Sequence, residues 1–412
     1  MNILLIDHYA GSPNMGMELR PYYLAKEWGK MGHKVVIVAG SFSHIRGRQP
    51  SIRSFSELEE SEGVDYFWIK TPSYKGSGIS RIISILVFVA KLLMKSGKLA
   101  SKIRPDIVIA SSTYPFDIFP AKRIAAKAGA RLVFEVHDLW PLSPVELGGM
   151  STRHPFIVVT QWVENYAYRS ADKVVSLLPL AKKHMVDHGM EGSKFIHVPN
   201  GIFIDEPTKE IPPIPGTHRI IMEAGKKRKM LQIGYFGSFV ISNDLETLFK
   251  TANLLRNDPV QFMLVGEGPE KENLMELKEK LRLDNLSILP FVSKASAQAM
   301  MREMDALYIG WKKKGIYRFG ISPNKLIEYM FAGKPVLYAI EAGNNMVEEA
   351  GCGICARPEN PESMKDAILR MAGMSPDERD EMGSRGRRHV LENYMFGDLA
   401  GKFLDGVNEK KK

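Results

Sequence analysis

Several features are scarce in this 412-residue sequence, and each absence excludes a class of protein. Cysteine occurs only twice, which excludes a disulfide-rich secreted framework. No stretch reaches the roughly 18 consecutive apolar residues that a membrane-spanning helix requires. The opening segment, MNILLIDHYAGSP, lacks a basic start and has an apolar run of only four residues. We therefore expect a buried first strand there and no signal peptide.

The two cysteines, Cys352 and Cys355, form a single C-x-x-C within GCGICA. No second pair of cysteine or histidine residues lies at zinc-finger spacing, and no thioredoxin-like context surrounds the motif. We interpret the pair as small apolar residues around a buried strand. Free thiols fit a reducing cytoplasm.

Charge is distributed unevenly along the chain. The net charge of +9 divides into +8 for residues 1–200 and +1 for residues 201–412. A basic first half favours an anionic partner there. Helix-turn-helix, zinc-finger and RNP-type signatures are missing, so we expect a membrane surface and no nucleic acid.

Short apolar runs alternate with amphipathic segments in both halves of the chain. We predict strands at 2–6, 34–39, 106–111, 131–136, 173–178 and 194–199, and again at 231–237, 260–268, 286–291, 305–310 and 334–340. Helices are predicted between them, for example at 18–31, 80–103, 117–129 and 155–170. Buried strands that alternate with helices are typical of parallel sheets covered on both faces. The prediction is an α/β fold with two doubly wound, Rossmann-like domains.

The domain boundaries follow from a change in composition. Residues 200–229 contain four prolines and a basic run, which is typical of a linker. We predict an N-terminal acceptor-side domain at 1–200, a linker at 201–230 and a nucleotide-sugar-binding domain at 231–385. A C-terminal helix at 386–412 is expected to pack back toward the first domain. Ligands bind beyond the carboxyl ends of strands in such sheets, so we expect a cleft between two facing domains.

The segment SPNKLIEYMFAGKPV (322–336) predicts a helix with a lysine at an unfavourable place. Ser322 can cap this helix and Pro323 suits its first turn. Lys325 is then close to the positive end of the helix dipole, where an anion would stabilise it. Glu328, one turn later, could accept hydrogen bonds from ribose hydroxyls. The alternative is a solvated Lys–Glu pair on a helix surface.

The longer segment GISPNKLIEYMFAGKPV resembles the nucleotide-sugar signature of glycosyltransferase family 4, a retaining family with the GT-B fold. Further similarity follows in family order at 11–40, 104–111, 198–202, 264–274 and 351–368. FEVHDLWPLSPVELGG (134–149) is similar to the branch that adds N-acetylfucosamine during O-antigen and capsule assembly.

The resemblance implies a retaining transferase (EC 2.4) that uses a nucleotide diphosphate donor. A UDP-sugar, such as a UDP-N-acetylated deoxyhexose, is favoured, and a lipid-linked glycan of bacterial surface polysaccharide is the expected acceptor. No D-x-D motif is present, so we expect no required metal and no cofactor. The alternatives are a UDP-sugar epimerase on the same fold, which needs no acceptor, and a non-catalytic GT-B scaffold.

The resemblance also assigns candidate site residues. The catalytic candidates are His137, Asp138 and Glu328. The donor-binding candidates are Gly16, Gly237, Gly266, Arg318, Ser322, Pro323, Asn324, Lys325 and Glu328.

His137 follows a predicted strand, and the resemblance implies that it approaches the donor sugar; taken alone, it could be structural. Asp138 could orient the imidazole, approach the acceptor or cap a turn. Glu135 is expected on the other side of its strand.

Three features depart from the family pattern, and one is that the arginine and lysine which many members carry after GYFGS are missing from residues 239–249. Gly320 occupies the place of the first of two glutamates that the family usually carries eight residues apart. Met15–Gly16 stands where a Gly-Gly pair is common. Gly16 still allows the backbone to approach a phosphate.

Residues 79–103 form a predicted helix with an apolar centre, Ile85–Ala90, surrounded by arginine and lysine. Such a helix can lie in a membrane interface or can pack on the first sheet. The basic first half favours the membrane, which would place the protein in the cytoplasm as a peripheral protein at the inner face of the cytoplasmic membrane.

Overall fold

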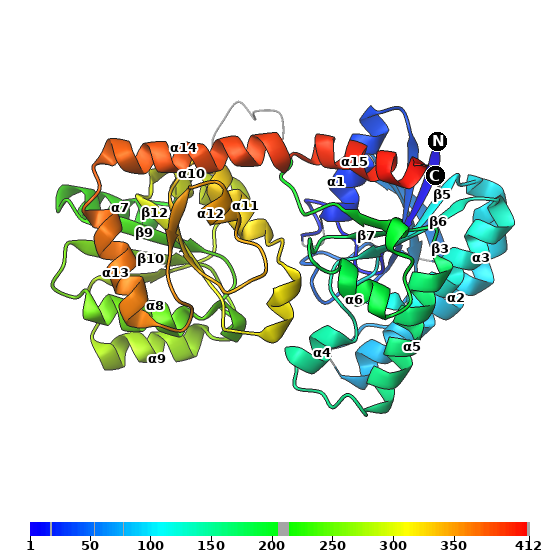
Figure 1. The fold of residues 1–412 in the computed structure, drawn as a ribbon, viewed down its shortest axis with the longest axis horizontal. Helices are drawn as coiled ribbons and strands as arrows, with labels where there is room; N and C mark the ends of the chain where they lie inside the picture. The colour runs from blue at the N-terminus through cyan, green and yellow to red at the C-terminus, as the bar shows by residue number, and fades with distance from the viewer. Residues whose placement is uncertain (17–18, 53, 77, 205–213, 410–412) are drawn as a thin grey trace. The chain divides into compact units, whose positions relative to one another are not determined.

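The computed structural model describes residues 1–16, 19–52, 54–76, 78–204 and 214–409. The chain forms two units (Figure 1). Unit 1 contains Met1–Phe203 and Phe396–Lys412, and unit 2 contains Ile204–Met395. Each unit holds one sheet with helices around it, so the predicted fold class of two Rossmann-like α/β domains is confirmed.

The sheet of unit 1 has the strand order β3-β4-β2-β1-β5-β6-β7-β8. Its strands are β1 (Asn2–Ile6), β2 (Lys34–Gly40), β3 (Ser56–Ser61), β4 (Val64–Ile69), β5 (Ile107–Ala110), β6 (Arg131–Val136), β7 (Lys173–Ser176) and β8 (Phe195–His197). All pairs are parallel except β3–β4. The sequence did not predict this hairpin, because the exposed edge strand β3 reads SELEES and has no apolar run.

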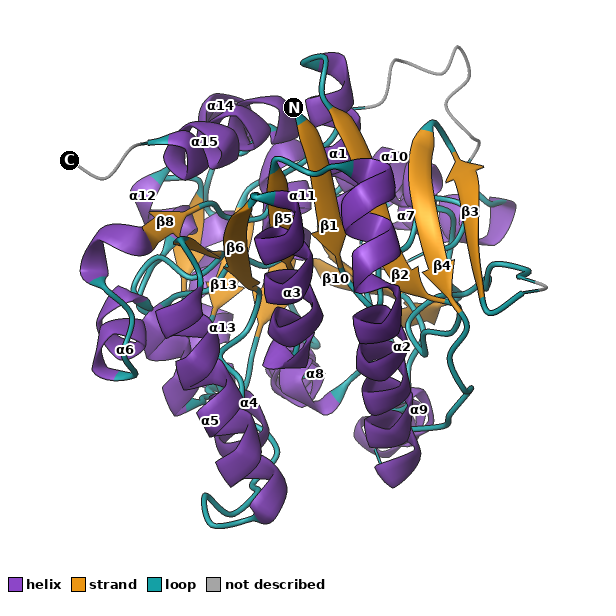
Figure 2. Cartoon of the chain, turned by 90° about the vertical axis from the view of Figure 1, so that its right-hand side faces the viewer, coloured by secondary structure: helices purple, strands orange, loops and turns teal. Residues whose placement is uncertain are grey.

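Helices cover both faces of this sheet. They are α1 (Arg20–Lys30), α2 (Ile79–Ile103), α3 (Ile118–Ala128), α4 (Leu142–Glu146), α5 (Pro155–Ser170), α6 (Lys182–Asp187) and α15 (Phe396–Asn408). On one face α1 packs with α15, and the Trp28 indole donates a hydrogen bond to the Ala400 carbonyl (3.0 Å). On the other face α2, α3 and α5 run side by side (Figure 2).

Unit 2 contains an all-parallel sheet with the order β11-β10-β9-β12-β13-β14. The strands are β9 (Leu231–Phe236), β10 (Val260–Val265), β11 (Leu286–Leu289), β12 (Ala306–Gly310), β13 (Val336–Ala339) and β14 (Gly353–Cys355). The helices are α7 (Gly216–Lys227), α8 (Leu245–Leu254), α9 (Lys271–Leu281), α10 (Lys294–Glu303), α11 (Asn324–Phe331), α12 (Met346–Glu349), α13 (Pro361–Ala372) and α14 (Pro376–Asn393). Beside β14, Cys352 is buried but Cys355 is exposed.

Two predicted boundaries differ from the structure. The expected linker, 201–230, contains helix α7, because a buried side of His218, Met222 and Gly225 anchors it to unit 2; residues 205–213 of that linker lie outside the described residues. The C-terminal boundary was also wrong. Helix α14 continues to Asn393 within unit 2, and the chain enters unit 1 only at Phe396, whose N–H bonds the Ile202 carbonyl (3.0 Å).

Helix α2 is a core helix with one exposed side. Ile85 and Phe88 are buried, whereas Leu86 is half exposed. Residues 79–103 therefore do not form a detached amphipathic helix. No helix in the described part of the chain is long and apolar enough to cross a membrane.

Candidate active site

Polar side chains collect where three neighbouring strands of unit 1 end. Strand β1 is followed by Asp7 and His8, β5 by Ser111 and Ser112, and β6 by His137 and Asp138. Strands β1, β5 and β6 are adjacent and parallel, so these residues share one edge of the sheet. Carboxyl ends of parallel strands are where open α/β sheets bind ligands.

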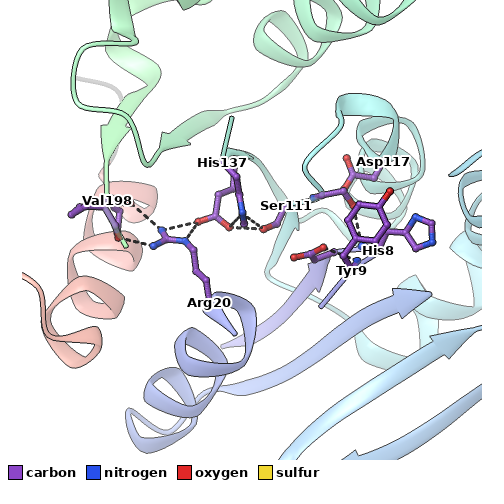
Figure 3. Close-up of polar contacts among 11 residues, drawn as sticks. His8, Tyr9, Arg20, Ser111, Asp117, His137 and Val198 are labelled. Atoms are coloured by element: carbon purple, nitrogen blue, oxygen red, sulfur yellow. Dashed lines mark hydrogen bonds and ion pairs between the residues drawn. The ribbon is translucent and has the colours of Figure 1, made fainter. Parts of the chain in front are cut away.

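A chain of hydrogen bonds fixes the imidazole of His137 (Figure 3). The Ser111 hydroxyl donates to Glu135 Oε2 (2.6 Å) and lies 3.0 Å from His137 Nε2. An ionised carboxylate can only accept, so Ser111 uses its proton on Glu135 and must accept from His137. It follows that Nε2 carries a proton. The Glu135 carboxylate oxygen Oε2 also lies 3.4 Å from Nε2.

Arg20, the first residue of α1, holds the other end of this chain. Its Nε and Nη2 donate to Glu135 Oε1 (3.0 and 2.9 Å), and its remaining donors reach the carbonyls of Val198 and Pro199 (3.0 and 2.6 Å). Burial acts to raise the pKa of Glu135, but the Arg20 charge and the bonds from His137 and Ser111 outweigh it and lower the pKa to about 2. Glu135 is therefore ionised at neutral pH.

The expectation that Glu135 lies on the other side of its strand was wrong. Residues two apart in a strand point to the same face, so Glu135 and His137 are on one side of β6. The period of the strand could have shown this. Arg20 and Ser111 were missed because no local pattern links them to Glu135, which is 115 and 24 residues away in sequence.

The two other unit 1 candidates have different surroundings. Asp138 is exposed, and the orientation of the imidazole falls to Ser111 and Glu135. Gly16 has a φ of 92° and forms an isolated bridge with Arg46. At this φ a side chain would be strained, so glycine at position 16 is required by the loop itself.

His8 and Asp117 lie at the same edge of the sheet, and burial shifts the pKa of both groups (Figure 3). The buried His8 ring stacks on Phe88 of α2 (centroids 4.4 Å apart), and burial lowers its pKa well below the usual value. Asp117 accepts from the Ser112 N–H (3.0 Å), and burial raises its pKa to about 7. Arg20 keeps Glu135 in its charged form, and Asp7, at the same edge of the sheet, interacts electrostatically with Arg46.

Unit 2 brings the donor candidates together around the start of α11. Lys325 Nζ donates to the Tyr235 hydroxyl (2.8 Å) and lies 4.3 Å from the centre of its ring. A Cβ on Gly237 would approach Lys325 Cε to 2.7 Å, so glycine admits the lysine beside the end of β9. Burial lowers the pKa of Lys325 to about 7, an effect that Glu328 opposes.

The residues before Lys325 form the N-terminus of the helix in a slightly different way from the prediction. Helix α11 begins at Asn324, with Pro323 and not Ser322 at the N-cap position, and no side chain caps it there. The Leu326 N–H bonds the Pro323 carbonyl (3.1 Å), so the N–H groups of Asn324 and Lys325 are the ones that could meet an acceptor from outside the helix. Tyr329 ties this helix to β9, because its hydroxyl exchanges hydrogen bonds with the N–H and carbonyl of Phe236 (2.7 and 3.1 Å).

The loop before α11 is built for glycine. Gly320 has φ 91° and ψ 171°, a region that is essentially restricted to glycine. A glutamate at this position would be strained, so the departure from the family pattern is accommodated in the backbone. The side chain of Asn344 holds the loop through the N–H and carbonyl of Ile321 (2.7 and 3.1 Å).

The remaining donor candidates have other neighbours. Glu328 pairs with Lys294 of α10 (3.3 Å), and both side chains are partly exposed. Arg318 is exposed and lies over the Phe319 ring (4.3 Å). Gly266 allows two loops to meet, because its Cβ would lie 1.9 Å from the Gly237 carbonyl. Within the described ranges, no three histidine, cysteine or acidic residues are grouped as a metal site.

Comparison with known proteins agrees with this architecture. Residues 15–201 match the model of the glycosyl transferase 4-like domain, and residues 231–373 match that of glycosyl transferases group 1. Over 361 residues the chain is 21% identical to WcaI of Escherichia coli (strain K12), named as a colanic acid biosynthesis glycosyl transferase; the match covers 85% of this chain and 87% of WcaI.

Solved structures show the same fold. Sucrose-phosphate synthase from Thermosynechococcus elongatus is 14% identical with a TM-score of 0.71, and the match covers 98% of each chain. Anabaena HepE, solved in complex with UDP, is 15% identical with a TM-score of 0.67, covering 98% of this chain and 99% of HepE.

The fold and the two matched models define the protein as a glycosyltransferase with the GT-B architecture. The match of residues 15–201 to the glycosyl transferase 4-like domain and the similarity to WcaI agree with the resemblance to family 4 seen in the sequence.

Proposed function

We propose that the protein transfers a sugar, with retention, from a UDP-sugar to a lipid-linked acceptor during assembly of a bacterial surface polysaccharide. The observation that carries the donor part is Lys325, a partly buried cation at the open N-terminus of α11 beside Gly237. WcaI is named for colanic acid biosynthesis, and structures of HepE are titled as complexes with UDP and UDP-glucose; both support this choice. A UDP-N-acetylated deoxyhexose is the proposed donor.

Unit 2 would bind the nucleotide. The diphosphate would accept hydrogen bonds from the first N–H groups of α11 and from Lys325 Nζ. Glu328 would exchange its bond with Lys294 for the two ribose hydroxyls. Arg318, exposed on the loop before α11, would add a further positive charge near the phosphates.

Unit 1 would supply the group that contacts the transferred sugar. The bond between the anomeric carbon and the diphosphate oxygen breaks, and the acceptor oxygen bonds to the same face of that carbon. The acceptor proton passes to the departing phosphate oxygen, whose charge Lys325 and the helix N–H groups stabilise. His137, held by Ser111 and Glu135, would bond a hydroxyl of the sugar as positive charge develops on the ring. The proposal needs no metal, and it places the protein in the cytoplasm, at the inner face of the membrane.

The test is a transfer assay with a panel of UDP- and GDP-sugars and a lipid-linked saccharide, with the product examined by mass spectrometry and its anomeric configuration by NMR. His137→Ala should lower turnover by on the order of a hundredfold or more while UDP affinity holds. His33→Ala, which removes a partly exposed histidine of the same unit, is the control. Conversion of the UDP-sugar without an acceptor would indicate an epimerase. UDP binding without any turnover would indicate a scaffold. Either outcome would refute the proposal.

A further inference from the structure

Helices α2, α3 and α5 lie side by side in one layer on unit 1 (Figure 2) and carry charged residues almost entirely of one sign. The three helices carry these cations: Arg81, Lys91, Lys95, Lys98, Lys102, Lys122, Arg123, Lys127 and Arg169. Their single acidic residue, Glu164, is buried and bonded to Tyr168 and Gln161. The three helices therefore carry positive charge that no exposed carboxylate of their own offsets; Glu60 and Asp65 of β3 and β4 line the same cavity as Lys98 and Lys102.

Most of the exposed apolar side chains of this layer lie at one end. On α2 they are Ile79, Ile83 and Leu86, and on α5 they are Val158, Val159 and Trp162; each is 50–76% exposed. These six lie in the first half of their helix, whereas Met94 of α2, 67% exposed, lies in the second half. Helices that follow strands of a parallel sheet begin near the carboxyl ends of those strands, so these residues lie toward the edge that carries His137.

An aromatic cluster joins α3 to α5 in this layer. The ring of Phe119 stacks on Trp162 and Tyr166 (centroids 6.1 and 5.3 Å apart). Lys122 Nζ donates to the Tyr166 hydroxyl (2.9 Å) and lies 4.7 Å from the ring centre. Exposed tryptophan and tyrosine beside lysine are typical of the boundary between acyl chains and headgroups, because each has an apolar body and a polar end.

The exposed apolar residues of α2 are not needed for the unit 1 core. The opposite side of α2 supplies that packing through Ile85, Phe88 and Leu92, all buried. Exposure of six large apolar side chains in water has an unfavourable free energy, and it is relieved only if another surface covers them.

We propose that the α2–α3–α5 layer docks on an anionic lipid bilayer. The apolar residues at the helix starts would enter the acyl boundary, and the lysine and arginine side chains would meet the headgroups. The exposed apolar side chains at the start of α2, Ile79, Ile83 and Leu86, are aliphatic and offer nothing for base stacking, which favours a bilayer over nucleic acid. Docking in this way brings the strand ends with His137 toward the membrane, where a lipid-linked acceptor is held. The proposal goes beyond the transfer reaction and can be tested without it.

The first experiment measures sedimentation of the full-length protein with phosphatidylcholine vesicles, with and without phosphatidylglycerol. Binding should require phosphatidylglycerol and should weaken as salt screens the cations. The double variant Lys98→Gln/Lys102→Gln should bind roughly tenfold to thirtyfold more weakly. Lys227→Gln/Lys280→Gln, exposed lysines of unit 2, is the control and should bind as the parent does.

The second experiment tests insertion. Ile83→Ser/Leu86→Ser should abolish sedimentation while UDP binding and the melting temperature hold. The control, Ile220→Ser/Ile241→Ser, changes residues of unit 2 that are even more exposed and should have no effect. Brominated lipids should quench the tryptophan fluorescence of the parent, and Trp162→Phe should lose that quenching but keep the binding.

Several outcomes would overturn the proposal. The parent protein could fail to sediment with phosphatidylglycerol vesicles, the unit 2 control variants could lose as much vesicle binding as the unit 1 variants, or brominated lipids could leave the tryptophan fluorescence of the parent unchanged. A dimer that Ile83→Ser/Leu86→Ser dissociates would instead make this face an interface between two copies of the chain. Failure of the transfer assay leaves vesicle binding unaffected, so the two proposals fail separately.

Discussion

Replacement of Glu135 by glutamine should destabilise unit 1 strongly. The substitution keeps the shape of the side chain but leaves the buried Arg20 guanidinium without its counter-ion. Removal of one partner of a buried ion pair costs about 3–5 kcal/mol. The pKa gives a similar magnitude, because a shift from 4.5 to about 2 corresponds to about 3 kcal/mol. We expect urea unfolding of unit 1, followed by circular dichroism, to show a loss in this range.

The chain offers a matched control for this change. Glu164 is equally buried in unit 1, but burial raises its pKa to about 8. It is therefore uncharged at neutral pH, and Glu164→Gln should cost about 1 kcal/mol or less. The double variant Arg20→Met/Glu135→Leu should recover much of the stability, since it leaves no buried charge.

The pH dependence follows from the direction of the Glu135 shift. Its pKa is lower in the folded protein than in the unfolded chain, so its contribution is fully present above pH 4.5 and is lost as the pH falls toward 2. In Glu135→Gln the unfolding free energy should depend less steeply on pH in that window. A variant within 1 kcal/mol of the parent at pH 7 would refute the assigned role of the Arg20–Glu135 pair.

The remaining predictions concern unit 2. Lys325 has a pKa of about 7 and loses its positive charge as the pH rises, so UDP affinity measured by calorimetry should fall between pH 7 and pH 9. Lys325→Arg, which stays charged, should flatten that dependence. A UDP affinity of the parent that does not change with pH would contradict this prediction. Glu328→Gln should weaken UDP binding by about 1.5–3 kcal/mol, with little change in melting temperature because its pair with Lys294 is partly exposed; unchanged UDP affinity would remove the ribose role. Gly320→Ala should destabilise unit 2 by about 1–3 kcal/mol. The control Gly216→Ala should not, because Gly216 has open space around its Cβ and an ordinary φ. If the two variants had equal melting temperatures, a side chain at position 320 would not strain the backbone.

The sequence by itself determined the alternation of buried strands and helices, and with it the two Rossmann-like domains. Hydrophobic period is a local property, and parallel sheets buried on both faces give long apolar strands that are read directly. The Lys325–Glu328 spacing and the strand-end position of His137 were also local and lie where the sequence indicated. The strand period of two residues would also have predicted that Glu135 lies on the same side of β6 as His137.

The tertiary structure alone decided the partners of these residues. Arg20 meets Glu135 across 115 positions of sequence, because α1 and β6 converge only when the sheet has formed. The return of α15 to unit 1 and the β3–β4 hairpin likewise depend on contacts that no local pattern encodes. The two sides of α2 show the same limit. An apolar helix face reads identically in sequence whether a core or a membrane covers it, and only packing shows which residues, such as Phe88, are covered and which, such as Leu86, are not.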